Sequence, residues 1–191
     1  TVVRKADGLS AEQLAARSVP PSGLSILGLL RHLAQMEHYW FINTLSRDDE
    51  PRPYVPDGDW DAQFRDAAAD ESVVADAFET WRAVCARADT VMDGLEPSDL
   101  DIVWDLEDKR GSVRGALLQV VYEYSRHCGH LDLLREAIDG QTGEPIPDAN
   151  VRLVPTKDPP GVPHAGYIYV RNADANGIQT DTKAVVLLTD D

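Results

Sequence analysis

Apolar residues recur every three to four positions along three long segments of this chain, at about residues 22–46, 70–93 and 112–138. That period places them along one face of an α-helix. The stretches between the segments are rich in proline, glycine and charged residues, which do not continue a helix. Because each helix must bury its apolar face, we expect the three to pack together as a mainly α-helical bundle.

Local signals predict where these helices begin and end. Ser22 and Ser112 precede the first and third segments, where a hydroxyl can accept the first backbone N–H groups. Gly140 follows the third segment, a position typical of a helix C-terminus. The connections at 47–62 and 97–111 are expected to be a loop and an irregular acidic segment.

Two shorter pieces come first. Residues 1–8 are interpreted as the end of a helix closed by Gly8. Ser10 and Gln13 form a capping-box pattern that opens a short helical turn. We interpret the first piece as the last turns of a truncated first helix, which would complete an up-down bundle of four.

The composition and the apolar pattern of the sequence change after residue 140. Residues 141–191 hold a cluster of prolines and two β-type runs, 166–171 and 183–188, with a turn-forming stretch at 172–177 between them. We therefore expect two parts. One is a helical bundle over 1–140, and the other is a Pro-rich extended tail that ends in a β-hairpin.

Charge and cysteine content limit the partners and the cellular setting that we expect. The chain carries 33 acidic and 18 basic residues, for a formal net charge of −15. Such a surface repels phosphate backbones and anionic membranes, so neither nucleic acid nor a membrane is an expected partner. No apolar run is long enough to span a bilayer. Two cysteines, Cys85 and Cys128, both in expected helices, favour a reducing cytoplasmic setting.

The last long helix carries a pair of residues suited to metal binding. Glu123 and His127 are four positions apart, so a carboxylate oxygen and an imidazole nitrogen can reach one point. His32 lies on the first long helix beside Gly28, a mid-helix glycine that would leave room for a ligand or a close helix. If the two helices pack face to face, His32, Glu123 and His127 offer three ligands to one divalent ion. Zn²⁺ is the first expectation, and Ni²⁺, Fe²⁺ or Mn²⁺ are alternatives.

Plainer interpretations stand beside this one. A Glu–His pair at that spacing arises by chance, and buried histidines are commonly satisfied by hydrogen bonds. His130, one turn further along the same stripe, is a candidate for proton transfer, for a substrate contact, for a fourth ligand or for an ordinary interior histidine. We expect His38 to be partly exposed. We expect Arg126 and Arg135 to form surface ion pairs.

The segments LGLLRHLAQMEHYWF (27–41) and EYSRHCGHLDLLREAIDG (123–140) resemble the DinB-like four-helix-bundle superfamily. They look closest to its actinobacterial branch, which includes mycothiol-dependent maleylpyruvate isomerase-like proteins. That resemblance covers about residues 1–140. It implies that the histidine of an H-L-A pattern, here His32, joins Glu123 and His127 as a metal ligand.

The resemblance favours a divalent-metal-dependent enzyme that uses a low-molecular-weight thiol such as mycothiol, as an S-transferase or an isomerase acting on a small molecule. His130 would then move a proton. Two alternatives are kept: a metal-dependent hydrolase, and a non-catalytic metal- or ligand-binding stress or scaffold bundle. A homodimer is also an open expectation.

Overall fold

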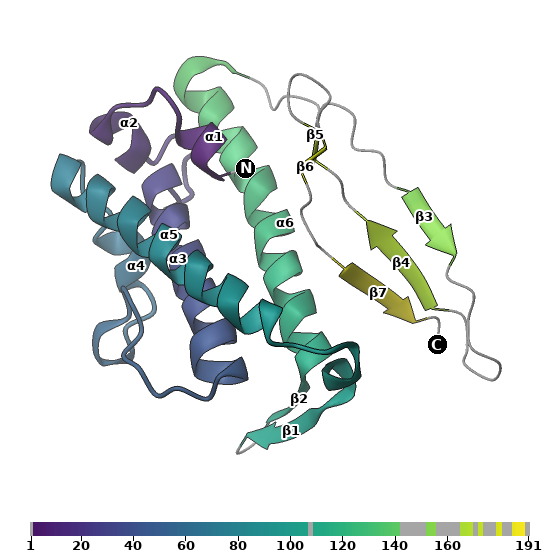
Figure 1. The fold of residues 1–191 in the computed structure, drawn as a ribbon. Helices are drawn as coiled ribbons and strands as arrows, with labels where there is room; N and C mark the ends of the chain where they lie inside the picture. Colours follow the sequence, from purple (N-terminus) through teal and green to yellow (C-terminus); the bar gives the residue numbers. More distant parts are fainter. Residues whose placement is uncertain are drawn as a thin grey trace. The chain divides into compact units, whose positions relative to one another are not determined.

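A computed structural model describes residues 2–106 and 109–141 and five later strands. The chain divides into two compact units, Thr1–Gly143 and Glu144–Asp191. The first unit is mainly helical, as predicted (Figure 1). Its helices are α1 (Val2–Ala6), α2 (Ala11–Ala15), α3 (Ile26–Glu37), the π-helix η1 (His38–Leu45), the 3₁₀ turn η2 (Pro56–Gly58), α4 (Ala62–Arg65), α5 (Glu71–Asp93), the 3₁₀ turn η3 (Pro97–Asp101) and α6 (Val113–Asp139).

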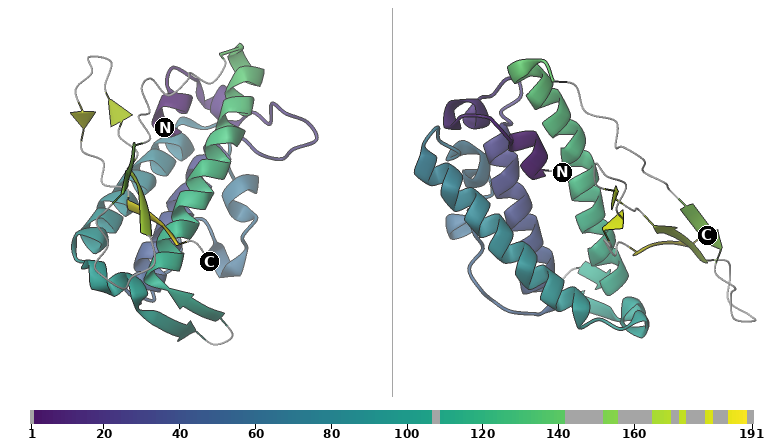
Figure 2. Two further views of the ribbon diagram at one scale, coloured as in Figure 1. Left: turned by 90° about the vertical axis from the view of Figure 1, so that its right-hand side faces the viewer. Right: turned by 45° about the horizontal axis from the view of Figure 1, so that its top comes forward.

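Helix α3 is the centre of this unit because it packs against both α5 and α6 (Figure 2). Every residue of α3 is buried except His32. The core around it is built from leucine, isoleucine, valine and alanine side chains of α1, α2, α3, α5 and α6. Burying such side chains is the main favourable term in folding. The one partly exposed residue of the central helix is thus a candidate metal ligand.

Several predicted boundaries are confirmed. The capping box at Ser10 and Gln13 is present. The Ser112 hydroxyl accepts the Gly115 N–H at the start of α6, and Gly140 ends that helix with φ +75°. The left-handed backbone at Gly140 is one that glycine adopts without steric cost.

The start of α3 differs from the prediction. Ser25, and not Ser22, caps the helix, and its hydroxyl accepts the Gly28 N–H. The Ser22 hydroxyl instead accepts the Leu24 N–H within a preceding turn. Both serines have a hydroxyl that can cap a helix, so the sequence alone does not show which one does. The path of the surrounding chain decides which serine stands at the first turn of α3.

The acidic segment 97–111 is more regular than predicted. It contains η3 and a two-stranded antiparallel hairpin, β1 (Val103–Leu106) with β2 (Lys109–Ser112). A Cβ at Gly111 would lie 2.6 Å from the Trp104 indole nitrogen, so only glycine lets this side chain lie across the hairpin.

Arg135 of α6 is buried, which corrects the expected surface ion pair. Its guanidinium donates to the backbone carbonyls of Lys5 and Asp7 and pairs with Asp139. These contacts join α1 and the turn after it to the end of α6. The short α1 therefore packs on the long helices.

The second unit contains β3 (Arg152–Pro155), β4 (Ala165–Tyr169), β5 (Asn172–Ala173), β6 (Gln179–Thr180) and β7 (Val185–Thr189). β4 pairs antiparallel with β3 and β7, and β5 pairs with β6. β4 and β7 overlap the two β-type runs of the sequence. The turn expected at 172–177 lies partly outside the described residues.

Candidate metal centre

The side chains of the three predicted ligands converge between α3 and α6. The His32 Nε2 lies 3.4 Å from the Glu123 Oε2, and the His127 Nε2 lies 3.3 Å from the same oxygen. One ligand atom of each residue lies within 4.8 Å of the others. Helix α3 supplies His32. Helix α6 supplies Glu123 and His127 from successive turns, as their spacing of four requires.

These separations fit a metal ion better than they fit direct hydrogen bonds. A charge-assisted N–H···O bond is about 2.7–2.9 Å long. In a tetrahedral zinc site with bonds of about 2.0–2.1 Å, neighbouring ligand atoms are about 3.3–3.4 Å apart. Two imidazole nitrogens and one carboxylate oxygen also suit a borderline divalent cation. The residues present therefore fit a metal of this class.

Burial favours the protonation state that a metal ligand needs. Burial, and then the charge of the nearby His32 ring, lowers the pKa of His127 to about 4. His127 is therefore neutral near pH 7, with a lone pair available on one ring nitrogen.

Gln63 of α4 orients His32, and sequence reasoning missed it. The Gln63 Oε1 lies 3.2 Å from the His32 Nδ1, so the amide oxygen accepts an Nδ1–H and leaves the Nε2 lone pair facing Glu123. The Gln63 amide nitrogen donates to the Trp60 carbonyl at 2.6 Å, which fixes which end of the amide faces His32. A lone glutamine in a loop-flanked short helix gives no periodic signal in the sequence.

Phe64 and Gly28 explain the mid-helix glycine. The Phe64 ring stacks on His32 with centroids 5.3 Å apart. A Cβ at Gly28 would come within 3.3 Å of the Phe64 ring. Of the two reasons expected for this glycine, the structure supports the close helix: α4 approaches α3 here and places both Gln63 and Phe64 against His32.

Gln63→Leu is expected to weaken metal binding about 10–100-fold, because outer contacts that orient a metal-ligating histidine have effects of that size. Competition titration with a chromophoric chelator measures the change. Gln63→Glu keeps an oxygen acceptor at the same position and should bind the metal more tightly than the leucine variant. Equal affinity of wild type and Gln63→Leu would show that the contact does not orient His32.

His130 contacts the far side of His127. Their Nδ1 atoms are 3.2 Å apart, so one ring donates and the other accepts. Since the His127 Nε2 faces Glu123, its Nδ1 carries the proton and the His130 Nδ1 accepts it. His130 is not part of the converging group of three ligand atoms among the described residues.

Other candidate residues are placed as follows. Arg126 is exposed, and its Nη1 lies 3.7 Å from the Glu123 Oε1, the oxygen that faces away from the two imidazoles. His38 is buried, which corrects the expected partial exposure, because η1 and the following loop enclose it against Asn43 and Glu50. Cys128 is half-buried and is not one of the three converging ligand residues.

A second buried polar cluster lies between α3, α5 and α6. The Tyr124 hydroxyl donates to the Glu37 carboxylate and accepts the Trp81 indole N–H at 3.0 Å. Burial raises the pKa of Glu37 to about 7, and burial together with Glu37 raises the pKa of Cys85 to about 12. Cys85 is thus an unreactive thiol at neutral pH.

Glu37→Gln is expected to stabilise the protein at pH 8 relative to pH 5. The folded-state pKa of Glu37 is raised, so the stability it contributes is present below about pH 4.5 and is lost as the pH rises through about 7. Glutamine avoids that loss and still accepts the Tyr124 hydroxyl. The free energy of unfolding of the variant relative to wild type should rise by about 1–3 kcal/mol between the two pH values. A pH-independent difference, or an equal trend in the exposed Glu79→Gln control, would contradict this.

Comparison with known proteins gives one result. Residues 1–140 match the family model described as mycothiol-S-transferase. Neither the search of curated proteins nor the search of solved structures finds a match. Within the described residues, no helix is both long and apolar enough to cross a membrane.

Proposed function

The chain belongs to the mycothiol S-transferase family, and we propose that it transfers mycothiol to an electrophilic small molecule at a divalent metal ion. His32, Glu123 and His127 would hold the ion. Zn²⁺ suits this donor set, and Ni²⁺, Fe²⁺ or Mn²⁺ are alternatives. The observation that carries the proposal is the convergence of these three ligand atoms within 4.8 Å of one another, with an imidazole nitrogen of His32 at 3.4 Å and one of His127 at 3.3 Å from the Glu123 Oε2.

Three protein ligands leave room for a fourth, exchangeable one, which is the arrangement of catalytic metal sites. When bound, such an ion lowers the pKa of a coordinated thiol, so that the thiolate forms at neutral pH. His32 is the one partly exposed residue of α3, so a small molecule would reach the ion from the side of this imidazole.

The chain's own residues orient the metal ligands and accept the proton of the thiol. Gln63 holds His32 with its Nε2 free, and Arg126 faces the outer oxygen of Glu123. His130 accepts the His127 Nδ1–H, which keeps the His127 Nε2 available. We also assign to His130, the half-buried imidazole beside His127, the uptake of the thiol proton. Its one lone pair accepts the His127 Nδ1–H, so His130 must release this hydrogen bond before it can take up a proton.

The overall reaction balances without a redox partner. The thiol loses its proton to a base, and the sulfur donates an electron pair to an electrophilic carbon. As the carbon–sulfur bond forms, the bond to the leaving group breaks and that group departs with its electrons.

The cytoplasmic location and the homodimer expected from the sequence stay predictions.

The proposal is tested with purified, zinc-loaded protein and chlorodinitrobenzene as the electrophile. Product should form above the uncatalysed rate only when mycothiol is present, and the rate should fall when the metal is removed by a chelator. Hydrolysis of ester substrates without any thiol would instead support the hydrolase alternative. Metal binding without affinity for mycothiol would overturn the transferase proposal and leave a binding protein.

A further inference from the structure

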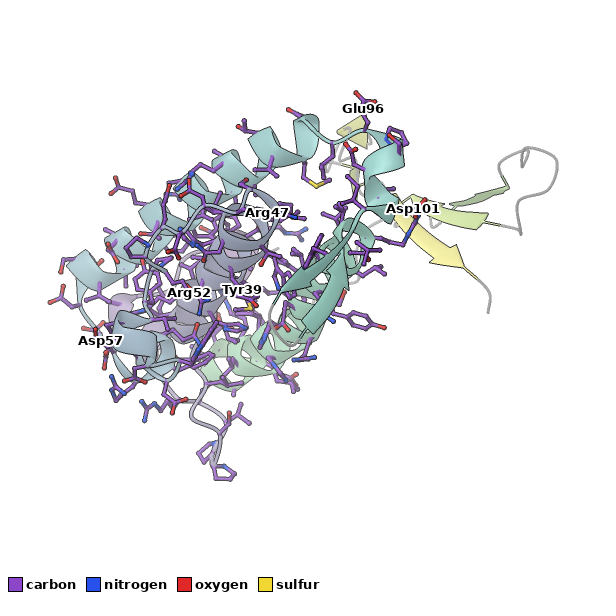
Figure 3. The ribbon with its side chains drawn as sticks, turned by 90° about the horizontal axis from the view of Figure 1, so that it is seen from below. Tyr39, Arg47, Arg52, Asp57, Glu96 and Asp101 are labelled. Carbon is purple, nitrogen blue, oxygen red and sulfur yellow. The ribbon has the colours of Figure 1, made fainter. Side chains whose placement is uncertain are left out.

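An aromatic–arginine cluster joins η1 to the loop that follows it. It consists of Tyr39 of η1 and of Arg52 and Trp60 of the loop. The Arg52 guanidinium carbon is 4.9 Å from the centre of the Tyr39 ring and 5.1 Å from that of the Trp60 ring. The two rings meet edge to face at 6.1 Å. Figure 3 shows Tyr39 and Arg52 close together on one face of the helical unit.

This cluster presents binding groups to solvent. Trp60 is 41% exposed, and Arg52 is exposed. Among the described residues, no carboxylate forms an ion pair with Arg52, although other arginines such as Arg65 and Arg87 do pair with acidic residues. In a chain with a net charge of −15, two aromatic rings hold this arginine. Within the part of the chain that the structure describes, no hydrogen bond uses its N–H donors, so they are available to a ligand.

The loop that carries Arg52 and Trp60 is held in a constrained conformation. Arg47, Tyr54 and Asp57 have positive φ angles of 57°, 61° and 52°. Such residues are strained and persist where other contacts hold them, which is common at ligand-binding sites. Here the Tyr54 hydroxyl donates to the Asp76 carboxylate at 2.7 Å, and Arg31 stacks on the Tyr54 ring.

Two connections place the cluster beside the metal centre. The Trp60 carbonyl accepts the Gln63 amide whose oxygen accepts the His32 Nδ1–H. Tyr39 lies in η1, which continues directly from α3, the helix that carries His32.

We propose that Tyr39, Arg52 and Trp60 bind the hydroxyl-rich rings of the thiol cofactor while its sulfur lies at the metal centre. Mycothiol is an acetylated cysteine joined to an amino sugar and an inositol. The exposed Trp60 face can pack against the C–H surface of such a ring, and the Arg52 N–H groups can donate to its hydroxyl oxygens. This inference rests on the proposed function and adds the site that distinguishes mycothiol from shorter thiols.

Isothermal titration of zinc-loaded protein with mycothiol, with its thiol-free amino sugar–inositol portion and with N-acetylcysteine tests the inference. Trp60→Ala and Arg52→Ala are each expected to weaken binding of the first two ligands about tenfold or more. Binding of N-acetylcysteine and the zinc content should not change. Trp60→Phe should restore part of the lost affinity. The matched control is Arg82→Ala, which removes an arginine stacked on Phe78 of α5.

Each outcome decides the inference. Unchanged mycothiol affinity in both variants would overturn it, and the transferase proposal would stand. Equal losses for mycothiol and N-acetylcysteine would also overturn it, because the cluster would then support the fold or the metal centre instead of binding the sugar. If wild-type protein binds N-acetylcysteine but not mycothiol, both proposals fail together.

Discussion

Glu123→Gln is expected to release the metal ion and to lower the rate of thiol transfer about a thousandfold or more. The Glu123 Oε2 lies within 3.4 Å of both imidazole nitrogens and is the only anionic donor of the group. An amide of the same shape lacks that charge, so metal affinity should fall by more than the roughly 10–100-fold that outer contacts contribute. A bound cation is worth several kcal/mol to the reaction, and each 1.4 kcal/mol is about tenfold in rate.

Elemental analysis after purification without chelator measures the metal, and product formation with mycothiol measures the transfer rate. Glu136→Gln, an exposed carboxylate on the same helix, is the matched control and should retain both. Full metal content together with an unchanged rate in Glu123→Gln would show that this carboxylate is not a ligand.

Leu131→Ala is expected to cost about 2–5 kcal/mol of folding free energy, the range for emptying a well-packed leucine site. Leu131 is fully buried in the core cluster with Leu30 and Leu134, one turn beyond His127. Truncating its side chain leaves a cavity beneath α6, the helix that supplies two of the three ligands. The unfolding midpoint of the helical unit should fall by roughly 10 °C.

Leu133→Ala is the control for this loss. Leu133 is 58% exposed on the same helix, so its truncation should change stability by less than about 0.5 kcal/mol. Thermal unfolding followed by circular dichroism compares the two variants. A Leu131→Ala protein as stable as Leu133→Ala would mean that α6 does not pack against the core as described.

The long helices could be predicted because the capping residues at their ends and the apolar period between them indicate the same helices. In α6, a capping serine at Ser112, a helical period of apolar residues and a terminal Gly140 all indicate the same boundaries. The same periodicity places Glu123 and His127 on one face of α6, so two of the three candidate ligands follow from one helix. The pairing with His32 needed in addition the resemblance to a known family, because periodicity does not say which helix faces which.

The remaining features depend on contacts between distant segments. Gln63 reaches His32 only because α4 folds back against Gly28. His38 is buried because the chain continues from α3 as the π-helix η1, and because the loop after η1 places Glu50 against the imidazole; the helical period of residues 22–46 indicates neither. The hairpin at 103–112 depends on Trp104 lying over Gly111. Tertiary contacts of this kind override local propensity, so a single sequence does not reveal them.

The most direct test of the metal centre is an anomalous diffraction map from crystals of the zinc-loaded protein, collected at the zinc absorption edge. We expect one peak per chain at about 2.0–2.2 Å from the Nε2 atoms of His32 and His127 and from the carboxylate of Glu123. A map with no peak between these three side chains, or with the zinc bound elsewhere on the chain, would contradict the account.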